Sequence, residues 1–211
     1  MLTAGGKLIN QGQITTANAA SNLSGSHIAL SAGSTLQAGG DVTLTSRSDI
    51  LLNGFTGAAG NLTLNATSYI INTALLYAGN NLMLLADSIQ NLHGDILAGN
   101  NLWMQKDETG TANTEVINRS GTIETVNGDI TPTPAAQYRV QMGDKEVVPG
   151  RTNGNAGRIA SSGDMTINAA NLENEASFLL AGGNMHLNGD TLSNQGWQEG
   201  TSATESVWVL D

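Results

Sequence analysis

Two pairs of acidic residues are the first candidates for chemistry in this chain of 211 residues. Asp87 and Asp107 are twenty residues apart, and so are Asp95 and Glu115. Two carboxyl groups held close together can serve as general acid and general base, the arrangement that most polysaccharide-cleaving enzymes use. Whether either pair meets depends on the elements that carry these residues.

A repeat of twenty residues organises those elements. Ala38, Ala58, Ala78 and Ala98 each open a similar phrase, such as AGGDVTL or AGNNLML. Two rows of apolar residues follow at the same spacing: Val42, Leu62, Leu82 and Leu102, then Leu44, Leu64, Leu84 and Met104. Their alternation with other residues predicts short strands that bury one face. The period returns near the C-terminus, between Met165 and Met185.

This period predicts an all-β fold, a right-handed parallel β-helix (β-solenoid) with coils of about twenty residues. Twenty residues is too short for an ankyrin repeat, a tetratricopeptide repeat or a propeller blade, and the helical segment of a leucine-rich repeat is missing. Gly and Asn tolerate positive φ and are expected at the corners. About nine coils at the strand spacing would form a rod roughly 40 Å long.

The period breaks twice, and the breaks predict insertions outside the helical stack. Asn91 and Asn118 are 27 residues apart, and Ile123 and Ile159 are 36 apart. The expected organisation is a single β-helical segment made of five parts: regular coils over 1–105, a polar loop over 106–113, a hairpin insertion over 132–150, regular coils over 159–196, and a tail over 197–211 that caps the rod or is a truncated hairpin.

The first break also separates the acidic pairs. In the corrected register Asp95 aligns with Thr122, and Asp107 falls in the polar loop. We therefore expect no catalytic residues, and a carbohydrate-active enzyme is only a remote alternative. Cysteine is absent, the three histidines are scattered, and the calcium-binding nonapeptide is missing. No metal site and no cofactor are expected.

The hairpin insertion, Pro132 to Gly150, differs in kind from the coils. It contains all three prolines, and YRVQM and KEVV alternate about a Gly143-Asp144 turn. Six of the eight basic residues lie between Lys106 and Arg158. One interpretation is a decorated loop with solvated charge, and the other is a recognition element on a rigid rod. The candidate receptor-binding residues are Tyr138, Arg139, Gln141, Met142, Lys145, Lys106 and Arg151.

Composition restricts the partners. Eight Lys and Arg against 18 Asp and Glu give a net charge of −10. Nucleic acids and anionic membranes need cationic patches, so neither is expected as a partner. The apolar runs are too short for a bilayer span, and the start of the chain has no apolar signal-peptide core, so we expect a piece of a longer protein.

Phrases such as AGNNLWMQKD, EVINRSGTIETVNGDI and AGGNMHLNGDTLSNQGWQEG resemble the filamentous-haemagglutinin repeats of two-partner-secretion exoproteins. They are most similar to the effectors of contact-dependent growth inhibition in Gram-negative bacteria. The resemblance implies a secreted filament on the bacterial surface, exported through an outer-membrane transporter and ending in a toxin that lies outside this segment. It also implies, for some central segments, recognition of an outer-membrane protein or lipopolysaccharide on a neighbouring cell. A passive stalk or adhesin repeat is the alternative.

Overall fold

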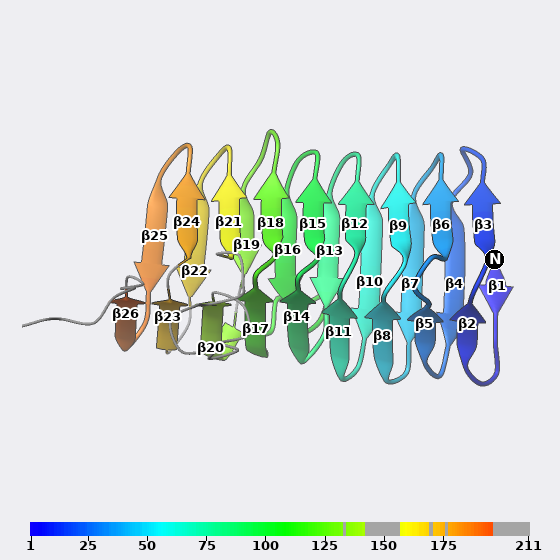
Figure 1. The fold of residues 1–211 in the computed structure, drawn as a ribbon, viewed down its shortest axis with the longest axis horizontal. Helices are drawn as coiled ribbons and strands as arrows, with labels where there is room; N and C mark the ends of the chain where they lie inside the picture. The colour runs from blue at the N-terminus through cyan, green and yellow to red at the C-terminus, as the bar shows by residue number, and fades with distance from the viewer. Residues whose placement is uncertain (133, 142–156, 169–170, 176, 196–211) are drawn as a thin grey trace, which may run out of the picture.

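The computed structural model describes residues 1–132, 134–141, 157–168, 171–175 and 177–195. In these residues the chain winds into a rod of short strands, with the N-terminus at one end and successive coils side by side along the axis (Figure 1). The described residues contain no helix, and therefore none that is long and apolar enough to cross a membrane. The predicted all-β solenoid is confirmed.

Each coil contributes strands to parallel sheets that run the length of the rod, which we call sheets A, B and C. Sheet A contains β1 (Leu2–Thr3), β4 (Ser21–Gly25), β7 (Val42–Ser46), β10 (Leu62–Ala66), β13 (Leu82–Leu85), β16 (Leu102–Gln105), β19 (Ile130–Pro132), β22 (Met165–Asn168) and β25 (Met185–Asn188).

The other two sheets complete each coil. Sheet B contains β2 (Leu8–Asn10), β5 (Ile28–Leu30), β8 (Asp49–Leu52), β11 (Tyr69–Asn72), β14 (Ser88–Leu92), β17 (Asn113–Arg119), β20 (Pro134–Gln141), β23 (Asn171–Glu175) and β26 (Thr191–Gln195). Sheet C contains β3 (Gln13–Thr16), β6 (Thr35–Ala38), β9 (Phe55–Ala58), β12 (Leu75–Ala78), β15 (Asp95–Ala98), β18 (Thr122–Thr125), β21 (Arg158–Ser161) and β24 (Phe178–Ala181).

The predicted rows of apolar residues form the core. Leu62 aligns with Leu82 on one side and Val42 on the other, and Leu82 aligns with Leu102. The three leucines are fully buried. Burial of one such side chain stabilises the fold by about 2 kcal/mol. The repeat in the sequence is therefore the coil of the structure.

Both predicted breaks occur where the register requires them. Asn91 pairs with Asn118, and Ile123 pairs with Ile159. The first insertion is slightly shorter than expected, because Asn113 is already the first, fully buried residue of β17. The coil resumes after each break with its inner residues aligned.

The structure differs from the expected hairpin of Pro132 to Gly150 in its first arm. Pro132 ends β19, and Pro134–Gln141 is β20, a strand of sheet B that pairs in parallel with β17 and β23. Alternation of apolar and polar residues fits a coil strand as well as a hairpin arm, so the pattern could not distinguish them. A proline at the first position of a strand is also tolerated. The expected turn and second arm lie outside the described residues.

A ladder of Asp and Asn side chains ties the coils together at the corner before sheet A. Asp41 Oδ1 accepts a hydrogen bond from the backbone N–H of Asn61 at 2.7 Å, and Asn61 Oδ1 accepts from the N–H of Asn81 at 3.2 Å. The series continues through Asn101, Asp129, Asp164 and Asn184. Carboxylate and amide oxygens therefore serve equally as acceptors of the backbone hydrogen bonds in this ladder. A Cβ at Gly79 would overlap the backbone carbonyl oxygen of Ala59, which explains the glycine there.

A second ladder of asparagines lies inside the rod, along sheet B. Asn72 Nδ2 donates to Asn91 Oδ1 at 2.8 Å, and Asn91 Nδ2 donates to Asn118 Oδ1 at 2.9 Å. The column then reaches Val140, which cannot continue the ladder, before it returns to Asn174. Among the described residues, the buried Oδ1 of Asn174 has no hydrogen-bond partner.

Thr56 is a polar exception in an apolar column, where it aligns with Leu36 and Leu76. It is fully buried, and its hydroxyl has no hydrogen-bond partner within the described part of the chain. We expect Thr56→Val to stabilise the rod by about 1 kcal/mol, because valine keeps the shape and removes an unsatisfied group. Thermal melting tests this against Thr45→Val at an exposed position, expected to change little. A lower melting temperature for Thr56→Val would contradict it.

Candidate recognition surface

The structure places four of the seven candidate recognition residues, in two different settings. Lys106 follows β16 directly, and Tyr138, Arg139 and Gln141 belong to β20. The other three candidates, Met142, Lys145 and Arg151, lie outside the described residues.

The first insertion comes before a strand of sheet B in the chain, and the second insertion comes after one. The loop of residues 106–112 precedes β17, whereas residue 142 follows the end of β20, and these two strands pair in parallel. The two ends of such a strand are roughly 20 Å apart. The twenty-residue period does not by itself indicate at which end of a strand each insertion lies.

The loop of residues 106–112 has its own internal order. Asp107 Oδ1 accepts hydrogen bonds from the Thr109 hydroxyl at 2.6 Å, from the Thr109 N–H at 3.0 Å and from the Thr111 N–H at 3.2 Å. The hydrogen bonds from Thr109 and Thr111 lower the pKa of Asp107 to about 2. Asp107 therefore stabilises the conformation of its own loop through these hydrogen bonds. Its carboxyl group remains ionised at neutral pH.

The acidic residues considered for catalysis do not form the pairs that chemistry would need. Asp87 lies 2.8 Å from Lys106 Nζ and accepts a hydrogen bond from Thr114 at 2.9 Å. The hydrogen bond from Lys106 is the main cause that lowers the pKa of Asp87. Asp95 aligns with Thr122, as the corrected register predicted. In the described residues no three His, Asp or Glu side chains are grouped to hold a metal.

Two of the basic residues near the insertions form ion pairs with acidic residues of the rod. Lys106 pairs with Asp87, with 46% of its side chain exposed, and Arg158 forms an ion pair with Glu124. The ion pair with Asp87 reduces the charge that Lys106 offers to a partner. The remaining basic candidates are Arg139, whose side chain the structure does not describe, and Lys145 and Arg151.

A titratable cluster that sequence reasoning missed links three coils at the start of sheet B. Asp49 and Tyr69 are register partners, and the imidazole Nδ1 of His27 is hydrogen-bonded to Asp49 Oδ1. Burial acts to raise the pKa of Asp49, but hydrogen bonds from His27, Ser48 and Tyr69 together hold it below the ordinary 3.8. The cluster therefore ties coils together through one carboxylate. Its signal in the sequence was only the twenty-residue spacing from Asp49 to Tyr69.

This cluster predicts a loss of stability in acid. A carboxylate whose pKa is lowered by folding contributes stability above its unfolded pKa, and that contribution is lost as the pH falls through the folded pKa. We expect Asp49→Asn to lower the melting temperature at pH 7 and to bring its values at pH 7 and pH 3 closer together than those of the parent. An unchanged difference between the two pH values would contradict this role.

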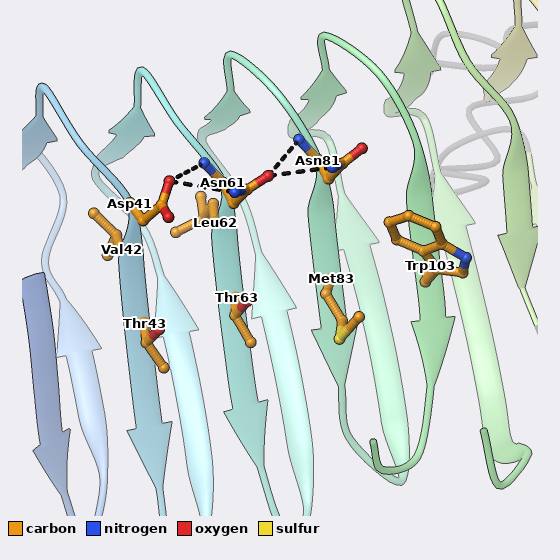
Figure 2. A pocket seen from close by; sticks show the side chains of 9 residues that line it. All are labelled: Asp41, Val42, Thr43, Asn61, Leu62, Thr63, Asn81, Met83 and Trp103. Carbon is orange, nitrogen blue, oxygen red and sulfur yellow. Dashed lines mark hydrogen bonds between the residues drawn. The ribbon is translucent and has the colours of Figure 1, made fainter. Parts of the chain in front are cut away.

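A shallow hollow of about 380 Å³ lies on the outer face of sheet A, across β7, β10, β13 and β16. Figure 2 shows one row of Asp41, Asn61 and Asn81 joined by hydrogen bonds, and the outward-facing side chains below it. Those side chains are Thr43, Thr63, Met83 and Trp103. The alternation in the sequence had placed these residues outside the core without indicating a hollow.

Comparison with known proteins identifies relatives along nearly the whole chain. The haemagglutinin repeat family matches residues 1–54, 57–102 and 136–207. Over 86% of its own length, the chain is 44% identical to the toxin CdiA of Escherichia coli. It is 40% identical over 92% to a tRNA nuclease CdiA of E. coli strain STEC_O31, and 34% identical over 99% to a tRNA nuclease CdiA of Yersinia mollaretii. The chain spans only 8% to 9% of the length of these relatives. No solved structure matches it.

Proposed function

Because the chain belongs to the haemagglutinin repeat family, we propose that it is a segment that recognises a receptor on a target cell during contact-dependent growth inhibition. The chain is a CdiA-like filament segment of a secreted exoprotein at the bacterial surface. The proposal adds recognition to that filament role. It also includes passage through an outer-membrane two-partner transporter during export.

The observation that carries the proposal is the clustering of both insertions in one part of a regular stack. From β7 to β16 the inner residues of sheet A repeat in step. Between β16 and β21 the chain adds residues 106–112 and 142–156. A surface that repeats from coil to coil discriminates poorly between partners, whereas loops on a rigid scaffold can specify one.

The residue types in the second insertion suit an acidic or phosphorylated outer-membrane partner. Met142 offers an apolar contact, and Lys145 and Arg151 offer basic side chains beside Asp144 and Glu146, which make the insertion neutral in a chain of net charge −10. Tyr138 and Arg139 are types enriched in binding hot spots, and they lie on the strand that leads into this insertion. Lys106 has less weight because Asp87 already pairs with it. The partner we propose is an outer-membrane protein or lipopolysaccharide on a neighbouring cell.

A passive stalk is the competing function, and one observation favours it. The corner ladder continues across both insertions, from Asn101 through Asp129 and Asp164 to Asn184. The rod therefore keeps its continuity and could set reach alone. In that case the insertions are decoration.

Attachment of the fluorescently labelled chain to intact bacterial cells tests the proposal. We expect Lys145→Glu with Arg151→Glu to weaken attachment by at least about 2 kcal/mol, the size of a binding hot spot. Replacing residues 142–150 with a Gly-Ser linker of equal length should abolish attachment and leave the circular dichroism spectrum unchanged, because β20 stays intact.

The matched control reverses two charges far from the insertions, Lys7→Glu with Arg47→Glu. This control carries the same change in net charge, so a loss of attachment common to both double variants would reflect general electrostatics. If the linker variant is folded and attaches like the parent, or if the parent attaches to no cell, the stalk is the function.

A further inference from the structure

We propose that the hollow on the outer face of sheet A binds a neutral oligosaccharide. It lies across four coils, between the corner ladder and the outward-facing side chains of β7, β10, β13 and β16 (Figure 2). It contains neither insertion, so this inference does not depend on receptor recognition by residues 142–150.

The polar side of the hollow offers hydrogen-bonding groups. Asp41 Oδ1 takes both hydrogen bonds from Asn61, which leaves its second carboxylate oxygen to face a ligand. The hydroxyl-bearing side chains of Thr43 and Thr63 also line the hollow, and both residues are half-buried. A hydroxyl both donates and accepts, which matches the hydroxyls of a sugar ring.

The apolar side of the hollow is the Trp103 indole beside Met83. They are register partners on adjacent strands, in the column that continues from Thr43 and Thr63. A half-buried indole presents a flat apolar face at low cost in conformational entropy. The C–H face of a pyranose ring packs on such a surface while its hydroxyls reach polar groups at the edge.

Charge and shape select the class of ligand. Asp41 is the one charged residue among those lining the hollow, which favours a neutral ligand over a phosphorylated, sulfated or carboxylated one. The three coil spacings from β7 to β16 are roughly 14 Å, the length of about three pyranose rings in a linear chain. Each of these strands is paired on both sides, so a peptide cannot add as a further strand.

Binding of the 211-residue chain to an immobilised panel of neutral, sulfated and carboxylated oligosaccharides of three to six rings tests the inference. We expect at least one neutral oligosaccharide to bind. Trp103→Ala should weaken that binding by about tenfold or more, and Thr63→Val should weaken it without altering the shape of the hollow. Tyr77→Ala is the matched control, since it removes an exposed aromatic side chain from sheet C.

The binding of the three variants distinguishes a site in the hollow from its absence. Binding that is lost with Trp103→Ala or Thr63→Val and kept with Tyr77→Ala supports the site. Thr63→Val carries the test alone if Trp103→Ala does not fold. Binding only to charged oligosaccharides, binding to none, or equal binding by folded Trp103→Ala would overturn it. None of these results depends on attachment to cells, so failure here leaves the receptor proposal to be judged separately.

Discussion

Leu82→Asp is expected to unfold the central coils. Leu82 is fully buried and lies in register between Leu62 and Leu102, so its replacement places an unpaired carboxylate in the middle of the core. An isolated buried charge costs several kcal/mol, comparable with the whole stability of many domains. In a solenoid each coil is supported only by its neighbours, so the disruption spreads from that coil along the rod.

Circular dichroism and thermal melting measure the effect. Met83→Asp is the matched control on the same strand, because Met83 faces outward at the edge of the hollow (Figure 2). The control should fold and melt close to the parent. A Leu82→Asp variant that melts like the parent would show that the inner and outer faces of β13 are assigned wrongly.

Asn91→Ala is expected to have the second largest effect, a loss of about 3 kcal/mol or more in the free energy of unfolding. Asn91 Nδ2 donates to Asn118 Oδ1 at 2.9 Å and to the Gly94 carbonyl at 2.8 Å, and all of these contacts are buried. Removing the amide leaves those acceptors without this donor and breaks the ladder from Asn72.

Urea unfolding compares this variant with Asn101→Ala. Asn101 is half-buried in the corner ladder and accepts a single backbone hydrogen bond, from the exposed Asp129 at 2.9 Å. Its replacement should lower the free energy of unfolding by about 1 kcal/mol. If Asn101→Ala costs as much as Asn91→Ala, burial is not what makes the inner ladder important.

The coil register could be predicted from the sequence because a period in the chain is itself the register of a solenoid. Once Asn91 was aligned with Asn118, the partner of Asp95 followed, and the structure has Thr122 there. The same arithmetic placed Ile159 on Ile123 across the longer break. Inner and outer faces then followed from the alternation of apolar residues.

Contacts that depend on side-chain direction could not be predicted in this way. Tyr138 carries the alternation of any strand, so only backbone pairing with Val116 and Leu172 shows that its segment belongs to the stack. His27 meets Asp49 across a spacing of 22 residues, which the period does not pick out. The hollow beside Trp103 requires outward side chains from four coils at once.

The most direct test of the account asks whether β20 lies in the stack, because the position of the second insertion depends on it. The chain contains no cysteine, so introduced pairs report on register without interference. Glu115 and Gln137 are register partners on β17 and β20. Adjacent strands are about 4.8 Å apart, within the Cα separation of a disulfide. Glu115→Cys with Gln137→Cys should therefore form a disulfide on mild oxidation, and Glu115→Cys with Arg139→Cys, offset by two residues, should not. Failure of the aligned pair, or equal cross-linking of both pairs, would contradict the account.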